Sequence, residues 1–243
     1  RYVIALVVPE CMFHASYLAT KQVAPTEQWW NACIHLLKYL YGVKDHGVKI
    51  GPIGSRNAVV NVYVDCSCMV YADGKSHGSC YVHIGNAGAS VYTSSNKLPL
   101  TETSSHGGEM RVLNERVNLG AHYVDVLREL DYAATAVVHE DNESVIRVVE
   151  SGTEAHDKKR KNLVAMTNSV KEFFDDPANY SKLVYVKTED NVADLGSKML
   201  VGKLFRKHRA FARGHDIPAE VKSKQSKPCS NNTDVLVTGV QKI

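Results

Sequence analysis

The chain has 243 residues, of which 44% are hydrophobic and 23% are charged, as in a globular domain with additional segments. No apolar run approaches the roughly 20 residues of a membrane span, and Arg1 to Pro9 lack the architecture of a signal peptide. The net charge of +3 and the pI of about 8.4 are compatible with nucleic-acid binding but do not indicate it alone. Because the first residue is Arg1 and not Met, we expect a piece of a longer protein.

The N-terminal quarter predicts helices followed by a linker. Residues 1–24 are apolar and compatible with a helix but show no clear period. Pro25 and Thr26 then start a predicted helix, in which apolar residues recur at helical spacing as far as Gly42. We expect Gly42 to take the left-handed position that ends this helix. Residues 47–56 contain three glycines and a proline and predict a linker.

Three strands are expected next, over 59–64, 79–84 and 89–94, the last two joined by the turn-forming segment 85–88. Thr101 to Ser105 offer N-caps for a long helix with an apolar face. The remaining pattern predicts strands over 134–139 and 183–186 and helices over 143–150, 158–174 and 191–199. Three hairpin-linked strands followed by alternating units indicate an α/β fold with a mixed sheet and helices on its faces. Residues 215–243 are rich in Lys, Ser, Asn and Gln, and we expect a mostly disordered tail.

The six cysteines, Cys11, Cys33, Cys66, Cys68, Cys80 and Cys229, form no C-x-x-C pair, and no histidine pair has zinc-finger spacing. We therefore expect reduced thiols, mostly buried, in an intracellular protein.

Four acidic residues stand at the ends of predicted strands or the starts of predicted helices: Asp65, Glu109, Asp141 and Asp194. Such positions can converge on one point of an α/β domain, and converging carboxylates repel each other unless a cation holds them. Hard divalent cations prefer oxygen ligands. Each acid taken singly is more often a cap or turn residue than a metal ligand, but the ordered set predicts a Mg²⁺ site for phosphoryl transfer.

Four ordered segments carry a resemblance to a known family: 25–42, 103–113, 140–146 and 188–198. They resemble the C-terminal end of a copia-type LTR-retrotransposon polyprotein, mainly its ribonuclease H domain. Glu109 falls on the second glutamate of the family's Ser-Ser-Thr-Glu-Ala-Glu-Tyr, and Asp141 begins a match to Asp-Asn-Gln-Ser-Ala-Ile. Asp194 lies in a close match to Thr-x-x-x-x-Ala-Asp-x-x-Thr-Lys.

The resemblance implies a ribonuclease H-like five-stranded sheet, with three antiparallel strands followed by two parallel ones. It divides the chain into a reverse transcriptase connection over 1–55, a ribonuclease H-like domain over 56–214 and the tail. The implied partners are an RNA·DNA hybrid and the polymerase domain of the same polyprotein, with no membrane. The implied location is intracellular, in cytoplasmic virus-like particles or the nucleus.

By the same resemblance, the four acids are catalytic residues that hold two Mg²⁺ ions, for which Mn²⁺ can substitute, and hydrolyse the RNA strand. Asp65 would contact both ions, Glu109 and Asp141 mainly one, and Asp194 the other. Predicted substrate contacts are Ser67, Asn142, Ser144, Lys158, Lys159, Arg160, Lys161 and Lys198. Helix capping explains Asn142 nearly as well, and a solvated helix face explains the basic run.

The chain departs from the family pattern in its first two motifs. Cys66-Ser67-Cys68 stands where the family has Ala-Asp-Trp, Gly107 replaces the first glutamate, and Met110 replaces the tyrosine. A non-catalytic module of the same fold that binds nucleic acid or supports the polymerase therefore stays as the alternative. An integrase-like strand transferase is disfavoured, because those enzymes order their carboxylates Asp, Asp, Glu, whereas here the Glu is second.

Overall fold

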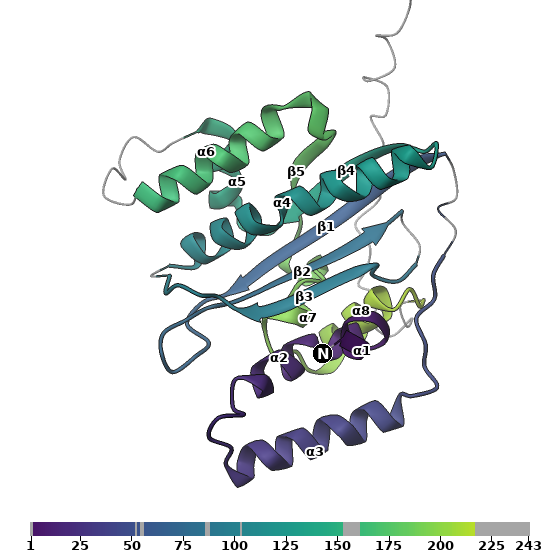
Figure 1. The fold of residues 1–243 in the computed structure, drawn as a ribbon, viewed down its shortest axis with the longest axis vertical. Coiled ribbons are helices and arrows are strands. Elements are labelled where there is room, and N and C mark those ends of the chain that lie inside the picture. Colours follow the sequence, from purple (N-terminus) through teal and green to yellow (C-terminus); the bar gives the residue numbers. More distant parts are fainter. Residues whose placement is uncertain are drawn as a thin grey trace, which may run out of the picture.

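A five-stranded mixed sheet forms the centre of the molecule, in the order β3-β2-β1-β4-β5 (Figure 1). Its strands are β1 (Asn57–Ser67), β2 (His77–Ile84), β3 (Tyr92–Lys97), β4 (Ala133–Glu140) and β5 (Ser181–Tyr185). The first three strands pair antiparallel, and β1, β4 and β5 pair parallel. This arrangement confirms the predicted fold class.

The computed structural model describes residues 2–51, 53, 56–85, 88–102, 104–152 and 161–216. The tail from 217 onward and the predicted substrate contacts Lys158, Lys159 and Arg160 lie outside these residues. No helix within the described ranges is both long enough and apolar enough to cross a membrane.

Every second side chain of the central strand β1 faces the main core. Val60, Val62 and Val64 are fully buried and contribute to the main core. The main core lies between the sheet and α4 (Ser105–Glu129), α5 (Glu143–Ser151) and α6 (Lys161–Asp175). Helix α4 begins at the predicted cap, because the Ser104 side chain accepts a hydrogen bond from the Gly107 N–H.

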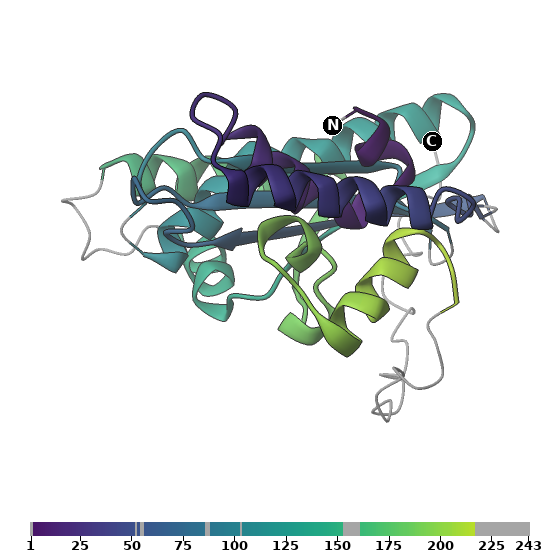
Figure 2. The same ribbon diagram turned by 90° about the horizontal axis from the view of Figure 1, so that it is seen from below.

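The opposite face of the sheet is covered by helices from both ends of the chain. They are α1 (Tyr2–Val7), α2 (Met12–Ala19), α7 (Asp194–Ser197) and α8 (Gly202–Ala212). A smaller core around Tyr81, Leu195 and Ala212 lies here, and Figure 2 shows α8 on the side of the sheet away from α4. Helix α3 (Glu27–Gly42) packs outside α2.

Three predictions of local structure were wrong. Strand β3 begins at Tyr92 and not at 89, because Ala89 instead forms an isolated bridge with Arg213. The last predicted helix, 191–199, is reduced to α7, and the basic segment that follows forms α8. Gly42 is not left-handed: it is the last residue of α3, and Val43, which caps the helix, has an ordinary φ of −111°.

A buried ion pair joins the N-terminal segment to the end of α8. The Arg213 guanidinium contacts the Glu10 carboxylate through two nitrogens, and both side chains are almost inaccessible to solvent. Tyr39 of α3 donates a hydrogen bond of 2.8 Å to Glu10, and Tyr81 of β2 donates one of 2.7 Å to the Pro9 carbonyl. Residues before the predicted linker thus pack directly onto the sheet, and the boundary at 55 stays a prediction.

Candidate metal centre

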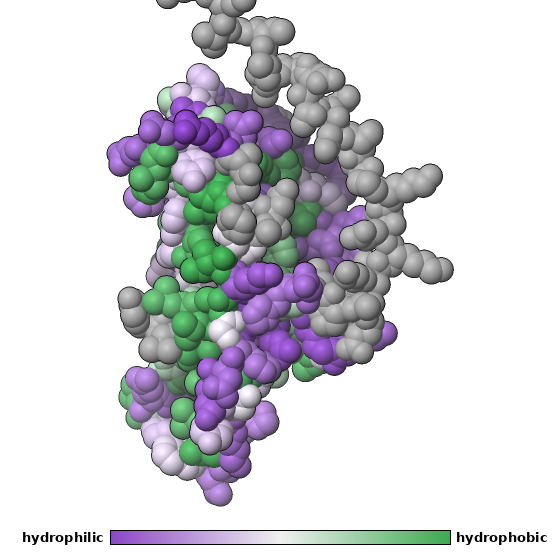
Figure 3. Space-filling model, turned by 90° about the vertical axis from the view of Figure 1, so that its right-hand side faces the viewer, coloured by the Kyte–Doolittle hydropathy of each residue, from purple (hydrophilic) through white to green (hydrophobic). Residues whose placement is uncertain are grey.

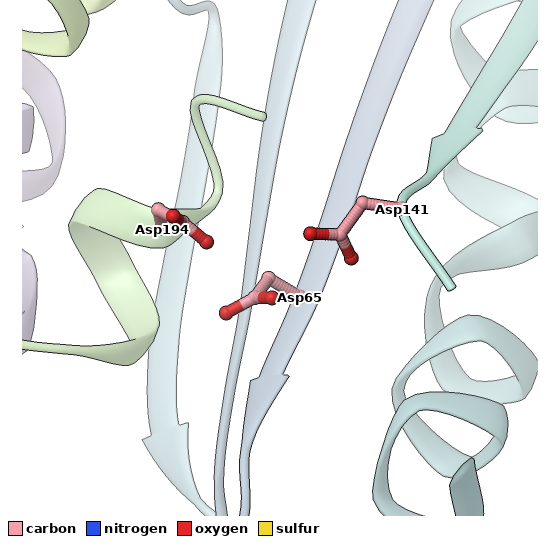
Figure 4. Close-up of side chains that lie close together, drawn as sticks. All are labelled: Asp65, Asp141 and Asp194. Carbon is pink, nitrogen blue, oxygen red and sulfur yellow. The ribbon is translucent and has the colours of Figure 1, made fainter. Parts of the chain in front are cut away.

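Three aspartates meet at one end of the sheet (Figure 4). Each offers a carboxylate oxygen, and these three oxygens, from Asp65, Asp141 and Asp194, lie within 4.8 Å of one another. The strand register explains two of them. Tyr63 of β1 pairs with His139 of the parallel strand β4; two residues later, Asp65 lies on β1 and Asp141 lies directly after β4. The structure therefore brings together three of the four predicted acids.

The third aspartate is positioned by α7, a four-residue helix fixed to the sheet. Asn191 donates a hydrogen bond of 2.9 Å to the Val64 carbonyl of β1. Ser79 of β2 donates one of 2.5 Å to the Ala193 carbonyl, and Ser95 of β3 donates one of 2.6 Å to the Gly196 carbonyl. These bonds orient the first residue of α7 toward β1.

Close approach of α7 to the sheet requires a glycine. A Cβ atom at Gly196 would lie 2.7 Å from the Ser79 Cβ and 2.9 Å from a ring carbon of Tyr81. The glycine in the motif that resembles the retrotransposon family thus has a packing role in this chain.

The fourth predicted acid, Glu109, belongs to a second group in the first turns of α4. Its carboxylate lies within 4.8 Å of oxygens from Glu140 and Asp141. Ser105 donates a hydrogen bond of 2.8 Å to Glu109 Oε1, and the Asn142 amide donates one to Oε2. Asp141 is therefore common to both acidic groups.

Glu140 was missed by the sequence analysis. It is fully buried at the end of β4, and its Oε1 accepts hydrogen bonds of 3.1 Å from the backbone N–H groups of Asp141 and Asn142. The strand period was a usable signal, because Glu140 follows Val138 on the core-facing side of β4. An acid at the end of a row of core-facing residues is unusual and therefore indicates a functional role.

Burial and mutual repulsion perturb the acids strongly. Burial raises the pKa of Asp194 to about 7, and the charge of Asp65 adds to this rise. Burial also raises the pKa of Asp65, Glu109 and Glu140, although Lys198 and the Ser197 hydroxyl oppose the rise at Asp65. The negative charges of these acids are thus only partly balanced by the groups around them.

Lys198 is the cation that faces this charge within the described residues. Its ammonium lies 2.7 Å from Asp194 Oδ1 and 3.8 Å from Asp65 Oδ2. Burial alone would lower the pKa of Lys198, but Asp65 and Asp194 raise it above the ordinary value, so the ammonium stays charged. One ammonium against five carboxylates leaves a set of oxygen donors that suits a hard divalent cation.

The other predicted substrate contacts have mixed outcomes in the structure. Asn142 is the N-cap of α5, accepting from the Ser144 N–H at 2.9 Å, so the capping interpretation is confirmed. Ser144 also contacts the His106 ring at 3.0 Å. Ser67 ends β1 two residues beyond Asp65, and Lys161 begins α6 with an exposed side chain.

Comparison with solved structures finds similar folds among ribonucleases H. The ribonuclease H1 of Halobacterium salinarum is 13% identical, with a TM-score of 0.40 over 56% of this chain and 90% of that one. LC11-RNase H1 in complex with an RNA/DNA hybrid is 14% identical, with a TM-score of 0.39 over 54% and 88%. The prototype foamy virus protease-reverse transcriptase is 13% identical, with a TM-score of 0.37 over 63% of this chain and 23% of that one. No protein-family model and no curated protein matches the chain.

Proposed function

We propose that this chain is the ribonuclease H domain of a copia-type retrotransposon reverse transcriptase and hydrolyses the RNA strand of RNA·DNA hybrids. The observation that carries the proposal is that Asp65, Asp141 and Asp194 lie close together at one end of the sheet. Asp141 also lies close to Glu109, the fourth predicted acid. The order and motifs of these four acids resemble that family, and their geometry suits metal-assisted hydrolysis.

The four acids would hold Mg²⁺ or Mn²⁺, and such ions, when bound, activate a water and stabilise the leaving 3′ oxygen. The chain's own side chains set the orientation of the ligands. The Ser197 hydroxyl donates to Asp65 Oδ2, and Ser105 and the Asn142 amide donate to the two oxygens of Glu109, so neighbouring side chains orient both carboxylates. Lys198 holds positive charge beside Asp194, where it can also meet a substrate phosphate.

The proposed partner is the polymerase domain of the same polyprotein, in a cytoplasmic virus-like particle or the nucleus. Helix α3 supports an interface, because Trp30, Leu37 and Tyr41 are 64%, 56% and 72% exposed. Figure 3 shows hydrophobic residues at the surface at the lower end of the molecule, where α3 lies in Figure 1.

A catalytically degenerate module is the second candidate, favoured by a specific observation. Lys198 already neutralises part of the charge on Asp65 and Asp194, and the first motif has lost its second acid to Ser67. Such a module would bind the hybrid without cleaving it.

A cleavage assay separates these candidates. Labelled RNA·DNA hybrid, duplex RNA and duplex DNA are incubated with the protein and Mg²⁺ or Mn²⁺, beside the Asp141→Asn variant. The proposal expects cleavage of the hybrid alone, lost in the variant. Binding of the hybrid without cleavage would favour the degenerate module, and cleavage of all three duplexes would contradict hybrid specificity.

A further inference from the structure

Glu140 is not one of the four acids of the proposed site, and one of its carboxylate oxygens has no assigned role. The side chain is 0% exposed, and its Oε1 already accepts two backbone N–H groups. Its Oε2 is buried and has no hydrogen-bond partner among the described residues. A buried polar atom without a partner is costly and calls for a ligand or a proton.

The surroundings of Glu140 favour a cation. A carboxylate oxygen of Glu140 lies within 4.8 Å of ligand oxygens from Glu109 and Asp141. The Asn142 amide occupies Glu109 Oε2, and Lys198 contacts the other acidic group, at Asp65 and Asp194. The charge of the Glu109–Glu140–Asp141 group therefore lacks a side-chain cation among the contacts of the described residues.

We propose that Glu140 is a ligand of a divalent cation held by the Glu109–Glu140–Asp141 group. The inference rests on the proposed function and adds a fifth carboxylate to it. Glu140 opens the segment 140–146, but the family motif Asp-Asn-Gln-Ser-Ala-Ile begins to match only at Asp141, so the motif does not supply Glu140. Three carboxylates in one group favour a hard ion with oxygen ligands, such as Mg²⁺ or Mn²⁺.

The competing explanation is a protonated Glu140 that only caps the end of β4. The substitution Glu140→Gln separates the two explanations, because the amide keeps an oxygen for the backbone N–H groups and removes the negative charge. A merely structural role would leave cation binding unchanged. A ligand role would weaken it.

The test measures Mn²⁺ binding by calorimetry and by the bound-ion signal in electron paramagnetic resonance. It compares the unaltered chain with Glu140→Gln, Glu109→Gln and the matched control Glu143→Gln, an exposed residue in the first turn of α5. We expect Glu140→Gln and Glu109→Gln each to weaken binding about tenfold or more, and Glu143→Gln to leave it unchanged.

The outcomes distinguish this inference from the proposed function. Unchanged Mn²⁺ affinity in Glu140→Gln, with weakened affinity in Glu109→Gln, would overturn the role of Glu140 and leave the proposed function intact. Absence of Mn²⁺ binding to the unaltered chain would overturn both. If Glu140→Gln does not fold, Glu140→Asp replaces it: a shorter side chain that keeps the charge should still weaken binding, and unchanged affinity would again overturn the inference.

Discussion

At the scale of single residues, the predicted acids differ in how the chain surrounds them. Asp65 accepts a hydrogen bond from the Ser197 hydroxyl and lies near the Lys198 ammonium. Glu109 accepts hydrogen bonds from Ser105 and Asn142. The orientation of each carboxylate is thus fixed by neighbouring side chains. Such preorganisation is what a metal ligand requires.

Asp194 predicts a pH-dependent stability for the metal-free protein. Its folded pKa of about 7 lies above its ordinary value of 3.8, so the stability it contributes is present below about pH 4 and is lost as the pH rises toward 7. Replacing it with Asn removes this loss. In chelator, Asp194→Asn should be more stable than the unaltered chain at neutral pH, by on the order of 2 kcal/mol, and the difference should shrink in acid.

Urea unfolding at several pH values measures this difference. A stability gain that is the same at pH 4 as at pH 7 would show that Asp194 does not titrate in this range. Burial lowers the pKa of His83, His139 and His208 to about 4, so both proteins lose stability through these histidines as the pH falls below 6.5. Their effect therefore cancels in the comparison.

Lys198 predicts a competition with the cation. Because its ammonium lies 2.7 Å from Asp194 and 3.8 Å from Asp65, it neutralises ligands that a metal ion would use. Lys198→Met should raise Mn²⁺ affinity by roughly tenfold, since a neutral side chain of similar length leaves both carboxylates uncompensated. Calorimetric titration measures this change, with Lys203→Met as the control, and an affinity that falls in Lys198→Met would contradict it.

The site could be predicted from sequence only where an acid stood next to a recognisable motif. Asp65, Glu109, Asp141 and Asp194 met this condition, and the structure brings them together in two adjoining groups. Glu140 also lies beside one of these motifs, and the period of β4 indicates that its side chain faces the core. Its approach to Glu109 of α4 could not be predicted, because it depends on tertiary packing.

At the scale of elements, the strands with apolar alternation were predictable and the polar ones were not. Strand β1 follows from Val60, Val62 and Val64. Strand β3 has the sequence Tyr-Thr-Ser-Ser-Asn-Lys, whose inward Thr93 and Ser95 are buried because they bond to α1 and α7. Helix α8 lies outside the predicted helices, although Ala212 and the partly buried Phe205 pack in the smaller core.

The short helix α7 predicts a sensitive position. Gly196→Ala would place a Cβ 2.7 Å from the Ser79 Cβ, so α7 must move off the sheet and take Asp194 with it. We expect a loss of about 1–3 kcal/mol in unfolding free energy, together with weaker Mn²⁺ binding. Gly42→Ala, at the open end of α3, is the control and should be neutral or more stable by up to about 1 kcal/mol.

Thermal unfolding and Mn²⁺ titration of these two glycine variants test the role of α7. Equal stability and equal cation affinity in both would show that α7 adapts to the added methyl group. Its hydrogen bonds to Ser79 and Ser95 would then not fix the position of Asp194.

At the scale of the whole molecule, one ion pair connects segments from opposite ends of the chain. Arg213→Met would leave Glu10 buried without its guanidinium, and the loss should be about 3–5 kcal/mol. The double variant Glu10→Gln, Arg213→Met should recover part of it, because no buried charge then stays unpaired. Urea unfolding of the single and double variants measures these changes. An equal loss of unfolding free energy in the single and the double variant would contradict the role of the unpaired Glu10 charge.

Cleavage of labelled RNA·DNA hybrid by the unaltered chain, by Asp65→Asn and by the exposed-residue control Asp125→Asn tests the central claim most directly. We predict Mg²⁺-dependent cleavage by the unaltered chain and the control, and no cleavage by a folded Asp65→Asn, because Asp65 lies within 4.8 Å of the Asp141 and Asp194 ligand oxygens. Retained Mg²⁺-dependent cleavage in Asp65→Asn would contradict the assignment of this acidic cluster as the active site.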